Sequence, residues 1–190
     1  TDYMEYEKWK KIYDILFENK IATEVYVDGK TYMDSCFDNS YYNKALKGDF
    51  IEELKSLINF CDNVTEALKD RGIEKLSAVY VPAEKQEALE NRFKEMNMAV
   101  TSSIPFNMEI NKWGVSKEKG LKMLCEKLGI MREEVMAFGD GNNDIEMLKW
   151  AGLSFAMGNA DEKVKKSAKY VAETNENDGV AVEIEKLIFK

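Results

Sequence analysis

One stretch in the C-terminal half constrains the fold most, because polar residues there directly follow an apolar run. Residues 135–138 are apolar, and this pattern predicts a short buried strand. Apolar residues recur at helical spacing over residues 145–151 and predict a helix. The residues between the two are Gly139, Asp140, Gly141, Asn142, Asn143 and Asp144. The polar cluster therefore lies where a strand turns into a helix, which is the edge at which open α/β sheets bind ligands.

A capped turn and a metal-binding loop are both consistent with this cluster. Asn, Asp and Gly favour turns for conformational reasons alone. Asp140 and Asp144 have no basic residue between them, so their charges repel unless a cation or a helix terminus offsets them. An EF-hand loop that starts at Asp140 is excluded, because its sixth residue would be Ile145 instead of Gly and its twelfth Ala151 instead of Glu. Carboxylates at a strand end suit Mg²⁺, which keeps several waters and usually shares a phosphate.

Helices and strands alternate throughout the last third of the chain. Ser116 is expected to cap a helix. The elements expected after that helix are a strand at 135–139, a helix at 144–151, a strand at 153–157, a helix at 161–168, a short strand at 170–171 and a helix from about 179. This alternation predicts a parallel, Rossmann-like sheet and an α/β fold class.

The N-terminal part mixes helices with strands and predicts an α+β layer. A helix to about residue 19 is followed by a strand at 21–27, and Asp28-Gly29 is expected to form a two-residue hairpin turn. Asp28-Gly29-Lys30-Thr31 could be mistaken for a catalytic Asp-Gly-Thr loop, but the hairpin explains it better. Further expectations are an aromatic loop at Tyr41-Tyr42, a helix capped by Asp49 that carries Leu54, Leu57 and Ile58, a strand at 76–81, a helix around 88–96, and strands at 98–102 and 105–110.

Composition excludes several classes of function. The formal net charge of -8 makes the protein a poor candidate for binding nucleic acid. The chain contains no His, which excludes imidazole zinc sites and His-based acid–base catalysis. Cys36, Cys61 and Cys125 lack metal-ligand spacing and are expected to be thiols of a cytoplasmic protein. No apolar run is long enough to span a bilayer, so no membrane association is expected.

The C-terminal motifs resemble one known family. The stretches that carry the resemblance are residues 135–144, Met147-Leu148, Ala151-Gly152, Ala156-Met157-Gly158-Asn159-Ala160, Gly114-Val115-Ser116-Lys117 and Asn177-Asp178-Gly179-Val180. Together they resemble the last motif region of the haloacid dehalogenase (HAD) superfamily and, more narrowly, its Cof-type phosphatases. The resemblance implies a HAD-like Rossmann core with an inserted α+β cap domain. Residues 1–110 would be the cap, which selects substrate, and residues 111–190 the C-terminal part of the core.

The resemblance also implies roles for four residues. Lys117 matches the lysine that contacts the phosphate and is the expected catalytic residue, although from the sequence alone an exposed lysine explains it equally well. Asn143 matches a phosphate-contacting amide. Asp140 matches the acid that coordinates Mg²⁺, and Asp144 the second acid of the loop. The expected cofactor is therefore Mg²⁺, and the expected partner is a small phosphorylated metabolite.

One family motif is absent from the 190 residues. The Asp-x-Asp-Gly-Thr motif supplies the aspartate nucleophile, and none of the Asp-Gly pairs here has an Asp two positions before it. We therefore expect the chain to be a cap and half-core that is inactive alone. A non-catalytic phosphate- or metal-binding α/β protein and an interaction module with a decayed site are the alternatives. If the chain is a cap and half-core, the strand at 135–138 lacks a neighbour, and one of two outcomes is expected: self-association through the open sheet edge, or a C-terminal half that is markedly less ordered than the cap.

Overall fold

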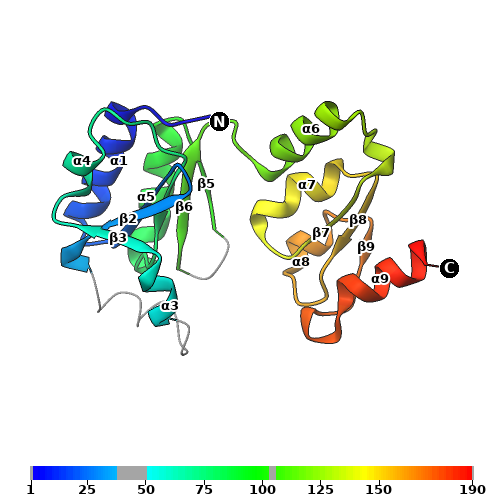
Figure 1. Cartoon of the computed structure of the whole chain (residues 1–190). Helices are drawn as coiled ribbons and strands as arrows, with labels where there is room; N and C mark the ends of the chain where they lie inside the picture. The colour runs from blue at the N-terminus through cyan, green and yellow to red at the C-terminus, as the bar shows by residue number, and fades with distance from the viewer. Residues whose placement is uncertain (1, 38–50, 103–105, 190) are drawn as a thin grey trace. The chain divides into compact units, whose positions relative to one another are not determined.

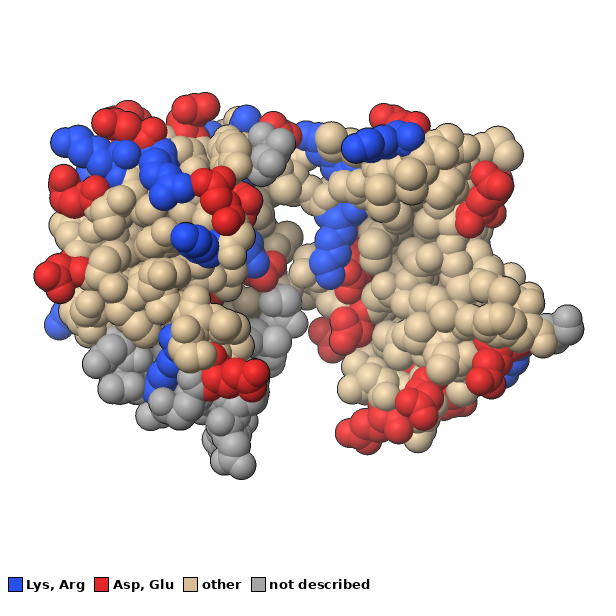
Figure 2. All heavy atoms as spheres, in the orientation of Figure 1, with Lys and Arg blue, Asp and Glu red and all other residues tan. Residues whose placement is uncertain are grey.

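The structure is a computed structural model that describes residues 2–37, 51–102 and 106–189 (Figure 1). The chain divides into two compact units, Thr1–Trp113 and Gly114–Lys190, which are described separately. In the view of Figure 2, acidic and basic side chains are interspersed over the surface of each unit. No helix in the described ranges has the length and apolar character needed to cross a membrane.

The first unit is built on a six-stranded sheet with the strand order β3-β2-β1-β4-β6-β5. Its strands are β1 (Thr23–Val27), β2 (Lys30–Asp34), β3 (Ile58–Cys61), β4 (Lys75–Ala78), β5 (Met98–Thr101) and β6 (Met108–Lys112). Its α-helices are α1 (Tyr6–Glu18), α3 (Ile51–Ser56), α4 (Val64–Ala67) and α5 (Ala83–Glu95), and a short 3-10 helix, η1, spans Ser35–Phe37. Only β2 and β3 pair in parallel; the other neighbouring strands of this sheet are antiparallel.

A single hydrophobic core joins three of these helices to the sheet. Trp9 of α1, Leu68 at the end of α4 and Phe93 of α5 are all buried in one cluster with the strand residues Val25 and Leu76. Residues of β1 alternate between buried and half-buried, as the period of a strand that is covered on one face requires. The helices α1, α4 and α5 therefore cover the same face of the sheet.

The predicted hairpin at Asp28-Gly29 is confirmed. β1 and β2 pair up to Val27 and Lys30, and both turn residues have positive φ, 51° at Asp28 and 70° at Gly29, as a type I′ turn requires. The carboxylate of Asp28 accepts hydrogen bonds from Tyr3 and Arg71. Both bonds lower the pKa of Asp28, and the bond from Tyr3 has the larger effect. Asp28 thus fastens the hairpin to neighbouring segments, which agrees with a structural part for this Asp-Gly pair.

The second unit contains a three-stranded parallel sheet with the order β7-β8-β9. Its strands are β7 (Met136–Gly139), β8 (Leu153–Ala156) and β9 (Tyr170–Val171). Its helices are α6 (Lys117–Leu128), α7 (Ile145–Trp150), α8 (Glu162–Lys165) and α9 (Gly179–Ile188), with 3-10 helices η2 (Arg132–Glu134), η3 (Asn142–Asp144) and η4 (Asn175–Asn177). The predicted alternation of helices and parallel strands is confirmed.

The two faces of this sheet differ in what covers them. Ala137 and Ala156 pack among residues of α6, α7 and α8 on one face. On the other face, Phe138, Phe155 and Tyr170 are register partners whose rings stack with centroids 5.0 and 5.4 Å apart. Figure 1 places α9 on this second side. Among the described strands β7 pairs only with β8, so it forms one edge of the sheet.

Two predicted helices differ from those observed. The helix expected to carry Leu57 and Ile58 ends at Ser56, and Ile58–Cys61 forms β3 because it pairs with β2 in parallel, with Thr31 opposite Ile58. The helix expected at 161–168 spans only Glu162–Lys165. The aromatic loop at Tyr41-Tyr42 and the cap at Asp49 lie outside the described residues.

A pair of glycine substitutions tests the packing of the second unit. A Cβ at Gly152 would lie 2.3 Å from the carbonyl oxygen of Arg132, whereas a Cβ at Gly120 would meet nothing within 4 Å. Gly152→Ala should destabilise this unit by about 1–3 kcal/mol because the backbone of η2 must move. Gly120→Ala, within α6, should stabilise it by about 0.5–1 kcal/mol. Amide hydrogen exchange over residues 114–189 measures both effects, and equal protection in the two variants would contradict this packing.

Candidate functional site

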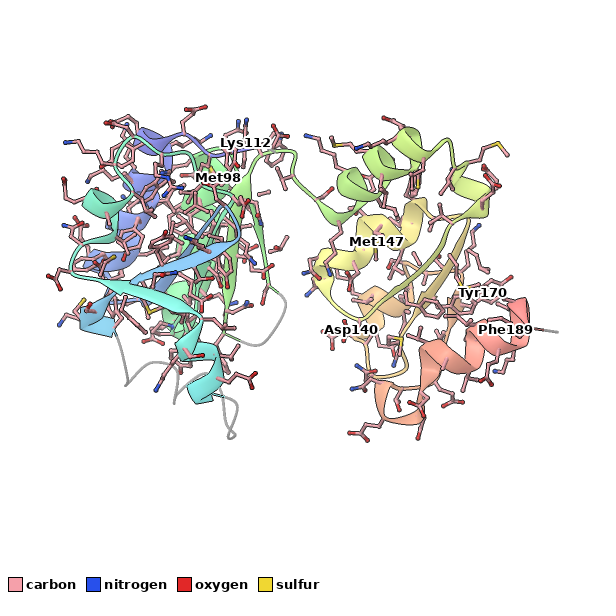
Figure 3. All side chains as sticks on the ribbon, viewed as in Figure 1. Met98, Lys112, Asp140, Met147, Tyr170 and Phe189 are labelled. Carbon is pink, nitrogen blue, oxygen red and sulfur yellow. The ribbon has the colours of Figure 1, made fainter. Side chains whose placement is uncertain are left out.

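The predicted polar loop lies at the carboxyl end of β7. Figure 3 labels Asp140 at the point where the chain leaves this strand. The loop then forms η3 and continues directly into α7. Asp140 is exposed to solvent, whereas Asp144 is 3% exposed. The two acids of the loop therefore occupy different environments, although they are only four residues apart.

Asp144 holds the loop together from inside. One of its carboxylate oxygens, Oδ2, accepts hydrogen bonds from the backbone N–H groups of Asp140 and Gly141, both at 3.0 Å. These bonds satisfy two backbone donors that would otherwise be left over at the end of the strand. They also offset the cost of burying a carboxylate. The loop between β7 and α7 is thus folded around the side chain of Asp144.

Lys117 reaches the same carboxylate from another helix. Its Nζ lies 2.5 Å from the other oxygen of Asp144, Oδ1. Lys117 is the first residue of α6, which is capped by the hydroxyl of Ser116 accepting from the N–H of Lys119. A cation in the first turn of a helix opposes the helix dipole and needs an anion nearby. Asp144 is that anion, and it directs the lysine to the loop.

Asn143 shares the loop with these residues. A Cβ at Gly141 would lie 2.7 Å from Oδ1 of Asn143, and a Cβ at Gly139 would lie 2.5 Å from Cβ of Asp144. A side chain at position 139 would displace the buried Asp144, so this position needs glycine, whereas at position 141 only the amide end of Asn143 would have to move. The amide of Asn143 consequently lies close to the backbone at Gly141.

The four predicted site residues are thus gathered at one edge of one sheet. Lys117 contacts Asp144, whose neighbour is Asn143, and Asp140 begins the same loop. The exposed carboxylate of Asp140, the half-exposed side chain of Lys117 and the carboxamide of Asn143 are available at this edge. An ammonium group and an amide can bind the oxygens of a phosphate, and a carboxylate can bind a hard cation.

Asp144 makes more contacts than the sequence indicated. It was expected as a second metal-ligating acid, and both of its oxygens accept from protein donors. Within the described part of the chain no three acidic or cysteine side chains lie together in a group that could hold a metal ion. Its contacts suit a residue that positions Lys117 and the loop. Its part in metal binding remains a prediction.

Comparison with known proteins identifies one family. The family model described as haloacid dehalogenase-like hydrolase matches residues 1–184. A B. subtilis structure described as a haloacid dehalogenase-like hydrolase superposes with a TM-score of 0.82 and 26% identity, over 98% of this chain and 72% of that one. The family and the fold thus agree in two independent comparisons.

Two similar curated proteins carry the same activity in their names, 5-amino-6-(5-phospho-D-ribitylamino)uracil phosphatase. YcsE of Bacillus subtilis is 47% identical over 97 residues, which are 51% of this chain and 39% of that protein. YbjI of Escherichia coli is 36% identical over 163 residues, 81% of this chain and 58% of that protein. The matched part therefore spans less than two thirds of either relative.

Alanine substitutions at the two acids should differ in their effect on stability. Asp144→Ala leaves the N–H groups of Asp140 and Gly141 without their acceptor and should destabilise the second unit by about 2–3 kcal/mol. Asp140→Ala removes an exposed side chain and should change stability by no more than about 0.5 kcal/mol. Hydrogen exchange at the amides of α7 reports both. If the two variants were equally stable, Asp144 would not be the residue that holds the loop.

Proposed function

Because this chain belongs to the haloacid dehalogenase-like hydrolase family, we propose that it is part of a Mg²⁺-dependent phosphatase of small phosphorylated metabolites. The resemblance to the HAD superfamily and its Cof-type phosphatases, read from the sequence, is confirmed. The observation that carries the proposal is the ion pair between Lys117 and Asp144 beside Asp140 at the carboxyl edge of a parallel sheet. This arrangement combines a cation for the phosphate with a carboxylate for the metal.

Each unit has its own part in this proposal. Thr1–Trp113 is the cap, which selects the substrate, and Gly114–Lys190 is part of the core that carries the phosphate site. The mixed sheet of the first unit and the parallel sheet of the second support this division, because parallel sheets bind ligands at their carboxyl edge. The substrate is a small phosphorylated metabolite, in keeping with the phosphate ester in the names of the two relatives.

Mg²⁺ fits the donor set of the loop. Asp140 is an exposed carboxylate at a strand end, and Mg²⁺ binds through few carboxylates while it keeps several waters. Asp140 would hold the ion, with Asp144 in a supporting place. When bound, the ion would offset the negative charge of the phosphoryl group.

Lys117 and Asn143 are the residues of this chain that contact the phosphate in this proposal. The ammonium group of Lys117 compensates charge on the phosphate oxygens, and Lys117 is therefore the catalytic residue of this chain. The carboxamide of Asn143 donates to the same phosphate. Asp144 keeps the flexible lysine side chain at the loop through its ion pair, which lowers the entropic cost of ordering it for the substrate.

The covalent step needs a carboxylate nucleophile that this chain does not contain in the family's Asp-x-Asp-Gly-Thr form. We therefore expect the 190 residues alone to bind the phosphate weakly and to hydrolyse nothing.

The three cysteines are thiols in the part of the chain that the structure describes, and a cytoplasmic location remains a prediction.

Substitutions at the loop test this function. In the product of the whole gene, Asp140→Asn and Lys117→Ala should each reduce kcat/KM for a small phosphate monoester by about 10²- to 10³-fold, since each removes a charge that offsets the phosphoryl group. Glu146→Gln, at an exposed ion pair of α7, is the matched control and should keep full activity. The measurement is Mg²⁺-dependent release of inorganic phosphate. Wild-type activity and Mg²⁺ dependence in Asp140→Asn would show that Asp140 is not the Mg²⁺ ligand. Hydrolysis by the 190-residue chain alone would contradict the proposal that it lacks the nucleophile.

Self-association through the open edge is the second expectation for the isolated chain. β7 carries Met136, Ala137, Phe138 and Gly139, without a charge or a proline that would discourage another strand from pairing. A second copy could pair with this edge and bury Phe138 and Met136, which are half-buried here.

Met136→Lys places a charge on the edge strand and should reduce dimerisation at least about fivefold. Met123→Lys, at an exposed position of α6, is the control and should leave it unchanged. Sedimentation equilibrium of the 190-residue chain measures both. A wild-type chain that stays monomeric across the concentration range would contradict the open edge.

A further inference from the structure

A cavity of about 290 Å³ lies in the first unit, apart from the proposed phosphate site. It opens between α1 and the segment that joins β3 to α4. Its lining consists of Lys10, Tyr13, Asp14 and Phe17 from α1, Asp34 from the end of β2, and Asp62, Asn63, Thr65 and Glu66 from the segment at α4. Ligand pockets usually measure roughly 300–1,000 Å³, so this cavity can hold only a small molecule.

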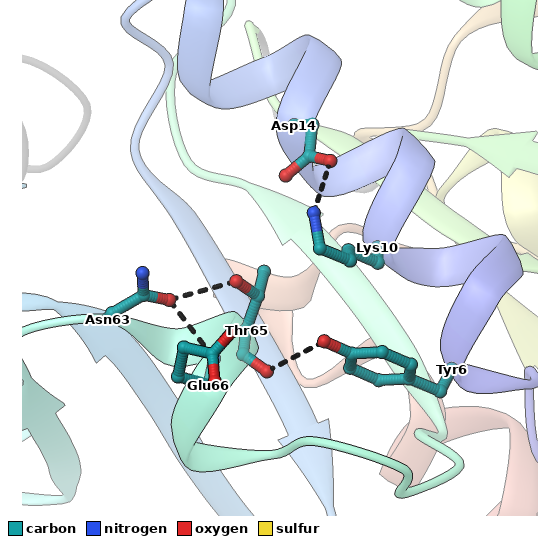
Figure 4. Close-up of polar contacts among 6 residues, drawn as sticks. All are labelled: Tyr6, Lys10, Asp14, Asn63, Thr65 and Glu66. Atoms are coloured by element: carbon teal, nitrogen blue, oxygen red, sulfur yellow. Dashed lines mark hydrogen bonds and ion pairs between the residues drawn. The ribbon is translucent and has the colours of Figure 1, made fainter.

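The wall of the cavity is held by hydrogen bonds on both sides. Figure 4 shows Asn63 accepting from the hydroxyl of Thr65 and from the N–H of Glu66, at 2.8 and 3.0 Å. The hydroxyl of Tyr6 on α1 donates to the carbonyl oxygen of Thr65 at 3.1 Å. These bonds tie α4 to α1, so the cavity between them is preformed.

A buried carboxylate lines the cavity. Asp34 is 3% exposed, and its two oxygens accept from the hydroxyl of Tyr13 and from the backbone N–H of Val64. Both donors are neutral. Burial, and then the hydrogen bond to Asp34, raise the pKa of Tyr13, so its hydroxyl keeps its proton. The carboxyl group of Asp34 is therefore hydrogen-bonded at both oxygens, and no basic side chain among the described residues contacts it.

The other charged side chains of the described lining also leave negative charge without a cation beside it. Asp62 and Glu66 are exposed at the rim. Among the described residues that line the cavity Lys10 is the one basic residue, and its Nζ is held by Asp14 at 2.7 Å. Four acidic side chains thus surround the cavity against a single lysine whose charge is already paired. An anionic ligand is excluded on this ground, and a cation is favoured.

The cavity also has an aromatic wall. The rings of Tyr13 and Phe17 stack with their centroids 6.3 Å apart, and Phe17 is 45% exposed. Aromatic faces attract cations and bury the apolar part of a small ligand. Acidic side chains alone would attract any cation, whereas the ring beside a buried carboxylate favours one with an apolar part.

We propose that this cavity binds a small organic cation, a primary ammonium group on a short alkyl chain. The ammonium lies between Asp34 and the rim acids Asp62 and Glu66, and the alkyl chain lies against Phe17. The exposed ring of Phe17 beside the acids favours a cation with an apolar part over a fully hydrated metal ion. The site is independent of the phosphate chemistry proposed for the second unit.

Amide chemical shifts of the ¹⁵N-labelled chain test the proposal, with n-butylammonium as the probe. Saturable shifts are expected at the amides of residues 10–17 and 62–66. The neutral molecule 1-butanol, which keeps the alkyl chain and loses the charge, should produce none that saturate in the same range. The double variant Asp62→Asn, Glu66→Gln should weaken binding of the probe by about fivefold, and Phe17→Leu by a similar factor.

Glu84→Gln, which removes an exposed acid of α5 outside the cavity, is the matched control and should bind as the wild type does. All of these variants lie at exposed positions, and unchanged amide shifts elsewhere in the first unit verify that it is folded. Equal affinity for 1-butanol would overturn the proposal in favour of an apolar cavity. Displacement of the probe by equimolar Mg²⁺ would overturn it in favour of a metal site, and the absence of any saturable shift would show that the cavity takes no cation.

Discussion

The buried carboxylate of Asp144 is the interaction on which the candidate site depends. It accepts two backbone N–H groups with one oxygen and the ammonium of Lys117 with the other. The first set of bonds folds the loop after β7, and the second brings a residue from α6 to that loop. A carboxylate that is 3% exposed is costly to bury unless it is satisfied in this way. The loop, the lysine and the acid are therefore one unit, and none of them has this geometry without the others.

The parallel sheet decides where that unit lies. β7 and β8 run in the same direction, with Phe138 opposite Phe155, and the N–H of Met157 donates to the carbonyl of Gly139. The ends of both strands therefore lie at the same edge, where the helices that follow begin. Asp140 is left exposed at this edge because Asp144 takes the buried position inside the turn. Two acids in one loop can thus serve different purposes, one for the interior and one for a ligand.

Local patterns predicted the second unit well. The apolar run at 135–138 predicted β7, and the helical spacing after it predicted α7. Both predictions hold because the burial of each element follows the period of its apolar residues. The place of Lys117 at a helix start indicates that its charge needs compensation, by solvation or by a nearby anion, but it does not indicate that Asp144 supplies it. That pairing joins residues from two helices, and one sequence carries no direct signal of it.

Patterns in the first unit were less informative where pairing in space decides the structure. Ile58 continued a helical spacing, yet it lies in a strand because β2 offers a parallel partner. Asp34 was not singled out, although it has the same parity as Tyr32 in β2 and so lies on the face that α1 covers. An acid on the buried face of a strand is the signal that could have drawn attention to Tyr13 and the cavity. The pair itself depends on how α1 packs on the sheet.

The most direct test of the account is a titration of the ¹⁵N-labelled chain with Mg²⁺ and inorganic phosphate, followed at single amides and at the Nζ of Lys117. The account predicts that Mg²⁺ shifts the amides of Asp140 and Gly141. Phosphate added afterwards should shift Asn143 and the Lys117 ammonium, while the amides of α9 stay in place. Shifts that spread over the exposed acids of the surface, with none concentrated at residues 140–144, would contradict the claim that this loop is the phosphate and metal site.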